Sequence, residues 1–395
     1  MQPNQFVTAV PYHPTRRRFL GLAGALGLAA CGGGGSDASG DGAAAGNNGR
    51  FVAQASMTEG RREPGIARLP DGRVLVAGGS PSSGSGVLAS TEIFDPRNGR
   101  WSAGPRMALG GVGRFMTPLA DGRVLAVQSS TVAEVYDPAS GLWTRVPAGP
   151  VGFALDGSMT LLADGSVLVL GFVQSMIYTP SANAWTPVAG FDGRRDHAAT
   201  QLADGRVFVS GGWINQSSQP LSTTLLFDPA RGTWQAGPRM RQARQLHFSV
   251  RLQDSKVLLT HGIVDTASLQ AASEIFDPQT GSFVSTAGAV VKFEASTIGA
   301  TATELGGGRL LVAGGGTTTG KTILDNPPQG GLDETNAEIF DPASRTWLRA
   351  TPPGTGLVTP RRYHSAVALS DGGVLVVGGI GLAGASTAAE IWRPA

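Results

Sequence analysis

The sequence predicts an all-β fold, a seven-bladed β-propeller whose last blade is closed by the N-terminal strand. Two series of repeated segments predict it, because several strands per unit at periods of about 50 residues are typical of propellers. A short apolar strand introduced by an Asp-Gly-type turn begins at 71, 121, 164, 204, 254, 307 and 371. A later strand with an ending like Phe-Asp-Pro follows each copy, at 93–96, 135–138, 177–180, 226–229, 275–278, 339–342 and 391–394.

Each repeat predicts four antiparallel strands. In the last one, residues 363–369 alternate enough for a strand, and Asp371-Gly372 signals a hairpin with a type I′ turn, which needs positive φ at its central residues. Residues 374–377 form a continuous apolar run, as expected for a strand buried on both faces. In the other repeats a fourth strand opens on an aromatic residue: Trp101, Trp143, Trp185, Trp234, Phe283 and Trp347.

The seventh repeat reaches Ala395 without its fourth strand. Residues 49–53 match residues 99–103 position by position in character, and Met57 falls where Met107 falls. We therefore expect residues 49–53 to complete the last blade, which removes an unpaired sheet edge.

Double glycines and the aromatic residues downstream of them resemble the kelch repeat, as found in the central domain of galactose oxidase and in other kelch propellers. The pairs are Gly78-Gly79, Gly211-Gly212, Gly314-Gly315 and Gly378-Gly379. The resemblance covers residues 50–395 and is closest over 360–379, whereas the second, third and fifth repeats lack the pair. A WD-type propeller is disfavoured, because no Trp-Asp dipeptide ends a strand.

The first 31 residues resemble an export signal. Residues 15–20 contain a twin-arginine pattern, residues 21–30 are a short apolar run, and 28–31 resemble a bacterial lipobox whose Cys31 becomes acylated. The alternative is an ordinary secretory signal with a chance cysteine. We expect a signal peptide with lipobox at 1–31, a flexible tether at 32–49 and the propeller at 50–395.

These segments predict an exported, lipid-anchored protein of the bacterial cell envelope. By resemblance, Gly32 after the cysteine favours the outer membrane, and the lipid is the only membrane contact expected. Cys31 is the only cysteine, so the mature domain has no disulfide. The formal charge of +2 becomes −1 once the three arginines of residues 1–30 are removed, so the charge gives no sign of a nucleic-acid partner.

The turns between strands predict which face binds. Turns of the Asp-Gly and Asp-Pro-x-x-Gly types are short and uniform, whereas the loops after the second strands vary greatly in length. These variable loops share a face with the connections between blades, and variable loops on a rigid scaffold are where binding usually occurs.

An arginine set lies just ahead of the first strands on that face. Arg62, Arg195 and Arg362 lie seven residues before the leucine that precedes the turn, Arg244 lies eight before its leucine and Arg114 five. Such a ring would attract carboxylate, sulfate or phosphate groups. The alternative is structural, with each arginine bonding to carbonyls or carboxylates of the next blade. Asp156 and Glu294 interrupt the set in the third and sixth repeats.

Other side chains on this face are candidates for binding. His197, His247 and His364 share one register, which suggests either a metal site or hydrogen bonds to the backbone; we expect the latter, and neither a metal nor a cofactor is predicted. Trp213 follows a double glycine beside Asn215 and Gln216, so it suits either sugar stacking or loop packing. The predicted ligand-binding residues are Arg62, Arg114, Arg195, Arg244, Arg362, Trp213 and His364, with Cys31 as the lipidation site.

Three classes of function remain open. The first is an envelope binding or scaffold protein that takes an acidic sugar, a glycan or an envelope protein at the loop face. The second is a kelch-type carbohydrate-active enzyme such as a sugar-acid epimerase or mutarotase, with Glu63, Asp196 and His364 as acid–base candidates. Galactose oxidase chemistry is disfavoured, because that family needs a cysteine joined to tyrosine and Cys31 is assigned to the lipid; a sialidase is disfavoured because its Asp-box is absent. The third class is a purely structural scaffold.

Overall fold

The computed structural model describes residues 48–81, 86–111, 115–129, 132–147, 157–172, 174–214, 219–264, 273–286, 299–316, 335–352, 355–381 and 383–395. Of the residues singled out in the sequence, several lie outside these ranges: Cys31, Arg114, Asp156, Asn215, Gln216 and Glu294.

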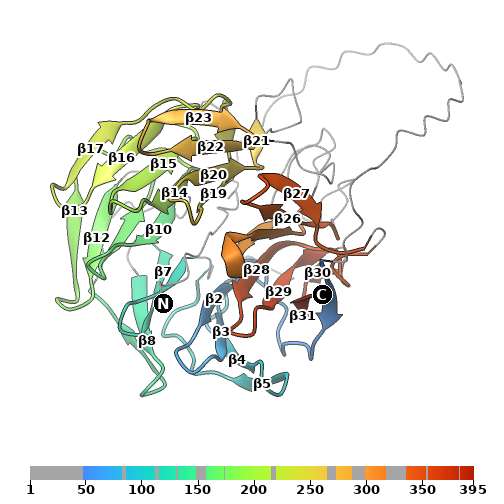
Figure 1. The fold of residues 1–395 in the computed structure, drawn as a ribbon. Helices are drawn as coiled ribbons and strands as arrows, with labels where there is room; N and C mark the ends of the chain where they lie inside the picture. The colour runs from blue at the N-terminus through green and yellow to red at the C-terminus, as the bar shows by residue number, and fades with distance from the viewer. Residues whose placement is uncertain are drawn as a thin grey trace, which may run out of the picture.

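Seven antiparallel sheets surround one axis, which confirms the predicted all-β propeller (Figure 1). Six of them have four strands, and the seventh also contains the short β30 (Gly384–Ala385). A separate two-stranded sheet pairs β18 (Arg244–Gln245) with β21 (Ile263–Val264). Blade 1 contains β2 (Gly65–Arg68), β3 (Val74–Ala77), β4 (Thr91–Asp95) and β5 (Arg100–Ala103). Blade 2 contains β6 (Met116–Pro118), β7 (Val124–Ser129), β8 (Val132–Asp137) and β9 (Leu142–Arg145). Blade 3 contains β10 (Ser158–Leu161), β11 (Val167–Leu170), β12 (Ser175–Thr179) and β13 (Ala184–Val188).

Blade 4 contains β14 (Ala198–Gln201), β15 (Val207–Ser210), β16 (Thr224–Asp228) and β17 (Thr233–Ala236). Blade 5 contains β19 (Phe248–Arg251), β20 (Val257–Thr260), β22 (Glu274–Asp277) and β23 (Ser282–Ser285). Blade 6 contains β24 (Thr301–Glu304), β25 (Leu310–Ala313), β26 (Ala337–Asp341) and β27 (Thr346–Arg349), with a 3-10 turn at Gly306–Gly308. Blade 7 contains β28 (Arg362–Ala368), β29 (Val374–Gly381), β31 (Ala389–Pro394) and β1 (Gly49–Ala53).

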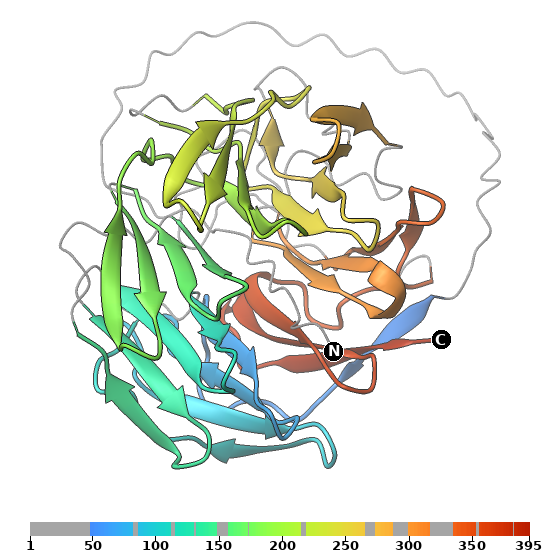
Figure 2. The ribbon, with the colours of Figure 1, turned by 60° about the vertical axis from the view of Figure 1, so that its left-hand side comes forward.

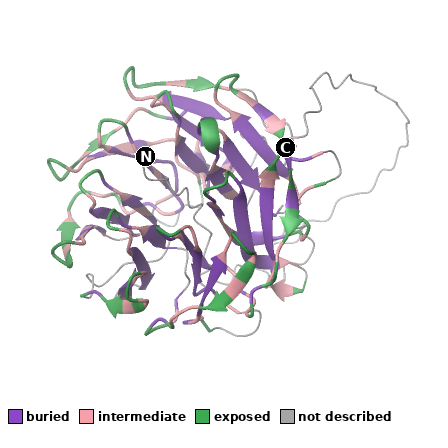
Figure 3. Ribbon diagram, turned by 60° about the horizontal axis from the view of Figure 1, so that its bottom comes forward, coloured by how far each residue is buried: buried purple, intermediate pink, exposed green. Residues whose placement is uncertain are grey.

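The first strand of each blade lies nearest the axis, and the fourth lies at the rim. Neighbouring first strands contact one another, as β2 does with β6 and β28. The second strands β3, β11, β15, β20 and β25 are buried throughout, whereas the fourth strands are mostly exposed (Figure 3). The apolar cores therefore lie between adjacent blades, and the turns at both faces remain available to solvent. Among the described residues, no helix is long and apolar enough to cross a membrane.

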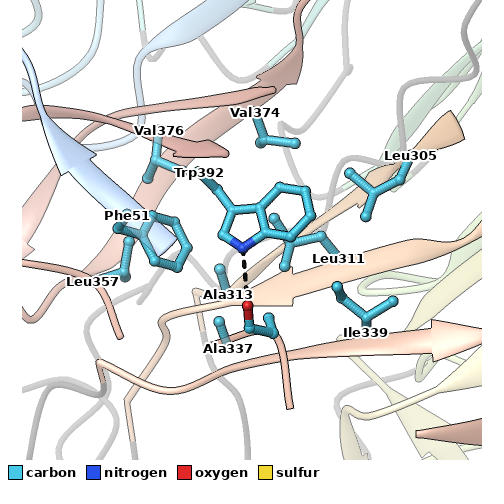
Figure 4. Packing of buried hydrophobic residues seen from close by; sticks show 11 residues of the cluster. Phe51, Leu305, Leu311, Ala313, Ala337, Ile339, Leu357, Val374, Val376 and Trp392 are labelled. Atoms are coloured by element: carbon cyan, nitrogen blue, oxygen red, sulfur yellow. Dashed lines mark hydrogen bonds between the residues drawn. The ribbon is translucent and has the colours of Figure 1, made fainter. Parts of the chain in front are cut away.

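The chain closes on itself in blade 7, as the sequence predicted. Strand β1 pairs antiparallel with β31 over five residue pairs, from Gly49 opposite Pro394 to Ala53 opposite Glu390 (Figure 2). Phe51 stands opposite Trp392, and both side chains are buried in a core shared with blade 6 (Figure 4). The indole Nε1 of Trp392 donates a hydrogen bond to the carbonyl of Ala350 at 3.1 Å. The two ends of the propeller are therefore joined by main-chain pairing and by packing.

The first hairpin turns differ from the predicted type. In blade 1 the amide of Gly72 donates to the carbonyl of Leu69 at 3.0 Å, and the amide of Leu69 donates to Arg73 at 2.8 Å. Only the glycine has positive φ, at 88°, so the turn is a type I turn followed by a left-handed residue and not a type I′ turn. Asp71 Oδ1 accepts the amide of Arg73 at 2.9 Å, which explains the aspartate in the repeat.

Candidate functional site

Three successive residues ahead of each first strand organise the loop face. We name them positions A, B and C, which lie eight, seven and six residues before the leucine that precedes the hairpin turn. The described residues at position A are Arg61, Gly111, Arg194, Arg244 and Arg361. Those at position B are Arg62, Arg195, Gln245 and Arg362. Those at position C are Glu63, Asp196, Leu246, Gly299 and Tyr363.

The arginines at position A are structural. Arg61, Arg194, Arg244 and Arg361 are each at most 1% exposed. Their Nη1 atoms donate to the carbonyl of the residue that opens the double glycine or its equivalent, such as Gly78 at 2.9 Å from Arg61 and Gly211 at 3.1 Å from Arg194. Each also forms an ion pair; the carboxylates are Glu92, Asp192, Glu274 and Glu390.

Arg244 therefore does not belong with the other predicted ligand-binding arginines. Its side chain is completely buried, and Nη2 lies 2.9 Å from Glu274 Oε1. The offset of eight residues places it at position A, where a guanidinium compensates a buried carboxylate. Gln245 occupies position B in this blade.

The arginines at position B stack on aromatic rings. The guanidinium carbons of Arg62 and Arg362 lie 4.7 and 5.8 Å from the centroid of the Tyr363 ring, so two cations from neighbouring blades approach one tyrosine. We call these three residues the arginine–tyrosine subsite. In blade 4, Arg195 lies 3.6 Å from the ring centroid of Phe172 and 5.4 Å from that of Trp213; these three residues form the tryptophan subsite.

Each subsite includes one carboxylate from position C. Glu63 Oε1 lies 3.7 Å from Arg62 Nη2 in the arginine–tyrosine subsite. Asp196 Oδ2 accepts a 2.7 Å hydrogen bond from the indole Nε1 of Trp213 in the tryptophan subsite.

Among the described residues, position C forms three main-chain hydrogen bonds between neighbouring blades. The amide of Glu63 donates to the carbonyl of Tyr363 at 2.9 Å, that of Tyr363 to Gly299 at 2.7 Å and that of Leu246 to Asp196 at 2.9 Å. These residues have φ between 52° and 72°, a left-handed conformation that costs about 1–2 kcal/mol for a residue with a side chain. The same conformation recurs at equivalent positions of different blades, where the main-chain hydrogen bonds between blades offset its cost.

The three histidines of common register lie in the protein interior. His197, His247 and His364 are 1, 2 and 5% exposed, so His364 is not placed on the surface of either subsite. Each Nε2 bonds to a hydroxyl of the preceding blade; the partners are Ser158, Ser210 and Thr301, at 2.9, 2.7 and 3.0 Å. His197 Nδ1 also bonds to the carbonyl of Arg194 at 3.0 Å, which fits a neutral imidazole. The expected backbone bond is thus found at His197, and all three imidazoles bond to hydroxyls.

His261, which replaces a glycine of the double-glycine pair, is also structural. Its Nε2 lies 2.9 Å from Oε1 of the buried Glu338 in the next blade. Its ring packs edge-on against Trp347 at 5.2 Å between centroids. Glu338 is equivalent to Glu92 and Glu274, each of which pairs with an arginine, so in this blade an imidazole takes the place of the guanidinium.

Acid is expected to destabilise the propeller through these buried imidazoles. Burial lowers the pKa of His197 to about 4 and that of His364 to about 3, and it lowers the pKa of His247 well below its usual value. The unfolded chain therefore binds more protons below pH 6.5, so stability is complete above that pH and is lost as the pH falls towards the folded-state values. Each histidine contributes about 1.4 kcal/mol per pH unit in that window.

Urea unfolding between pH 7 and 4.5 tests this dependence. The His197→Gln variant should lose less stability on acidification than the parent protein, even if it is weaker at pH 7. Parallel curves of unfolding free energy against pH for the two proteins would contradict the assignment.

Two comparisons bear on the fold. Residues 194–241, which span most of blade 4 and include Arg194 and Arg195, match the Kelch motif. A solved structure described as "Novel fungal alcohol oxidase with catalytic diversity among the AA5 family, in complex with copper" is 17% identical, with a TM-score of 0.67. The match covers 88% of this chain and 77% of that chain. The molecule is thus a propeller with a Kelch motif and a galactose-oxidase-like fold, and an identity this low shows the fold alone.

The described residues do not fit a copper centre. Within the described ranges, no group of three His, Cys, Asp or Glu side chains lies close enough together to hold a metal ion. His197, His247 and His364 lie in three different blades, and each is bonded to a hydroxyl.

Sequence reasoning found part of this site. It identified Arg62, Arg195, Arg362 and Trp213, which the structure places in two groups. It missed Tyr363 and Phe172, on which the guanidiniums stack. The signal for Tyr363 was its register, since it occupies the same position as Glu63 and Asp196.

Proposed function

We propose that the protein is a cell-envelope binding protein that holds an acidic sugar, or a glycan containing one, at the loop face around the propeller axis. The observation that carries this proposal is the arginine–tyrosine subsite, in which Arg62 and Arg362 approach one ring. The planar guanidinium suits bidentate bonds to a carboxylate.

The subsite is supported by a rigid frame. The backbone of Arg62 pairs with Ser80, and that of Arg362 pairs with Ile380. Ser365 Oγ donates to the carbonyl of Pro64 at 2.6 Å, which ties blade 7 to blade 1 beside the site. The side chain of Arg62 is 25% exposed and is therefore available to a ligand, whereas Arg362 and Tyr363 are 8% and 6% exposed. A preorganised cation pays less conformational entropy on binding.

Calorimetry with a uronic acid and with the neutral sugar of the same stereochemistry tests the proposal. The acid should bind and the neutral sugar should bind at least tenfold more weakly, a difference of about 1.4 kcal/mol. Arg62→Gln and Arg362→Gln should each weaken binding of the acid by a similar factor. The matched control is Arg393→Gln, because Arg393 pairs with Asp371 in a hairpin turn at the other face. Equal affinity of all three variants and the parent protein would refute the site.

The envelope location is part of the same proposal. It is supported by the twin-arginine pattern, the apolar run and the lipobox-like segment that ends at Cys31. Metabolic labelling with radioactive palmitate should label the protein in a bacterial host, and Cys31→Ser should abolish both the label and the membrane association. An unlabelled parent protein would remove the lipid anchor.

A sugar-acid epimerase or mutarotase is the second candidate. Glu63 and Asp196 lie beside the cations with φ of 53° and 52°, and strained backbone often occurs at functional sites. However, Leu246 takes the same conformation without a titratable group, so the main-chain bonds between neighbouring blades are sufficient to account for it. His364 is unsuited to proton transfer, since burial lowers its pKa to about 3. We therefore prefer binding, and anomer exchange of a uronic acid that is faster with the parent protein than with Glu63→Gln would reverse that preference.

A further inference from the structure

We propose that the outer rim of blades 6, 7 and 1 is a membrane-docking surface, which binds the anionic headgroups of phospholipids beside the lipid anchor. This inference rests on the proposed envelope location, and it adds a second membrane contact to the single one expected from the sequence. Four exposed arginines carry it, which we call the rim arginines: Arg50, Arg100, Arg345 and Arg349.

The start of the fourth strand carries arginine in only one part of the ring. The residue just before the aromatic one is Arg50 in blade 7 and Arg100 in blade 1. Blade 6 has Arg345 one position earlier, where the other blades have glycine or asparagine. In blades 2 to 5 the residue before the aromatic one is neutral: Leu142, Ala184, Thr233 and Ser282. At these two positions, the positive charge is therefore confined to three consecutive blades.

These three blades form one strip of rim around the start of the propeller. Strands β27, β1 and β5 belong to consecutive blades and follow one another along the rim (Figure 1). Asn48 Nδ2 donates to the carbonyl of Arg349 at 2.8 Å, which places the end of β27 beside the start of β1. Trp101 Nε1 on β5 donates to the carbonyl of Ala55 at 2.7 Å, just beyond the end of β1. The rim arginines therefore surround the segment that leads to the expected lipid anchor.

The rim arginines lack carboxylate partners within the described part of the chain. No side chain among the four forms an ion pair or hydrogen bond with another described residue. The nearby aspartates are already engaged, since Asp95 pairs with Arg97 and Asp371 with Arg393. Asp341 accepts a main-chain amide of its own turn at 2.9 Å. The arginines at position A differ, because they are buried and ion-paired.

An anionic bilayer is the partner that fits these charges and this place. Planar guanidiniums form bidentate hydrogen bonds with phosphate oxygens. The chain from Cys31 to Gly49 has about 18 residues and is rich in glycine and alanine. A flexible chain of that length spans about 25 Å on average, so a lipid on Cys31 would hold the strip near the bilayer. A single acyl chain binds membranes only marginally, and a basic patch is a common second contribution.

Docking through the rim would leave the loop face open. The rim arginines lie at the fourth strands, on the outside of the ring. Arg62 and the other residues at position B lie just ahead of the first strands, around the axis. The propeller would stand edge-on to the bilayer, and a ligand could reach the loop face without passing between protein and lipid.

Fluorescence energy transfer to labelled lipids tests which side of the ring approaches the bilayer. The lipidated protein is reconstituted in vesicles of phosphatidylcholine with or without phosphatidylglycerol. Cys31 is the only cysteine, so one introduced cysteine can carry the fluorophore. Ser102→Cys in blade 1 and Gln235→Cys in blade 4 are matched, because each exposed residue follows the aromatic residue of a fourth strand. With phosphatidylglycerol, transfer from the blade 1 label should rise above that from the blade 4 label, and salt should reverse the rise.

Two double variants identify the residues responsible. Arg50→Gln with Arg100→Gln should lower the ratio of docked to undocked protein about 30-fold and remove most of the rise in transfer. The matched control is Arg239→Gln with Arg241→Gln, which removes the same charge from exposed arginines in the connection between blades 4 and 5. The control should keep the rise, and thermal unfolding checks that both variants are folded.

The outcomes separate this inference from the envelope location. Flotation with phosphatidylcholine vesicles reports the lipid anchor alone. A parent protein that does not float would overturn the envelope location and this inference with it. A protein that floats but shows equal transfer from the two labels, with and without phosphatidylglycerol, would overturn the docking surface and leave the anchor intact. An equal loss in the control variant would also overturn it, because total charge and not the rim would then decide.

Discussion

Replacing Trp392 by alanine is expected to lower the free energy of unfolding by about 3–5 kcal/mol. The side chain is 1% exposed and packs with Phe51 in the core between blades 6 and 7 (Figure 4). The substitution leaves a cavity and removes the bond to the carbonyl of Ala350. Because Trp392 stands opposite Phe51, the cavity lies where the two ends of the propeller meet, and ring closure should weaken with it.

Urea unfolding of Trp392→Ala measures the loss, and Trp101→Ala provides the control. Trp101 lies on the fourth strand of blade 1, where its ring is half-buried and its Nε1 bonds to the carbonyl of Ala55. The control should therefore lose clearly less stability. Equal losses in the two variants would show that the closing blade has no special role in stability.

Replacing Arg361 by methionine is expected to destabilise the protein by about 3–5 kcal/mol, because it leaves Glu390 buried without its cation. Arg361 is fully buried, Glu390 is 1% exposed and the two are ion-paired. Glu390 also accepts the amides of Val358 and Thr359 at 2.7 and 3.0 Å, so it cannot move to solvent without breaking the loop.

Two further variants identify the cause. Adding Glu390→Gln to Arg361→Met should recover part of the lost stability, since the amide oxygen keeps an acceptor for the loop but carries no charge. Arg393→Gln, which breaks an ion pair whose side chains are 37% and 46% exposed, should change the unfolding free energy by at most about 1 kcal/mol. A large effect at Arg393 or no recovery in the double variant would contradict this account.

The fold was predictable because the same strand pattern occurs in every repeat of the sequence. Seven copies of one strand pattern gave the blades, and the match of residues 49–53 to 99–103 gave the closure, which β1 confirms. The hairpin type was not predictable from Asp-Gly alone, because that dipeptide serves both a type I′ turn and a type I turn followed by a left-handed glycine. The number of residues between the paired strands decides between them, and that number depends on register.

The candidate site was predictable only in part. The adjacent arginines Arg61-Arg62, Arg194-Arg195 and Arg361-Arg362 contain both classes, and the sequence offset separates them once the first arginine of each pair is known to be at most 1% exposed. Arg244 was assigned wrongly because its offset of eight residues was treated as equivalent to seven. Arg62 stacks on Tyr363 and Arg195 on Phe172, and each pair joins residues from different blades. A local sequence pattern therefore does not predict these contacts.

The three main-chain hydrogen bonds between blades at position C do not depend on which side chains stand there. The bonded residues include an acid, an aliphatic residue, a glycine and an aromatic residue, yet the amide-to-carbonyl distances stay between 2.7 and 2.9 Å. Between these blades the spacing of the loop face is therefore set by the backbone, while the proposed ligand contacts come from the neighbouring side chains at position B. Exchanging arginine for glutamine or glutamate at position B is therefore expected to change which ligands bind without changing the spacing of the backbone. The same backbone would then accommodate ligands of different charge.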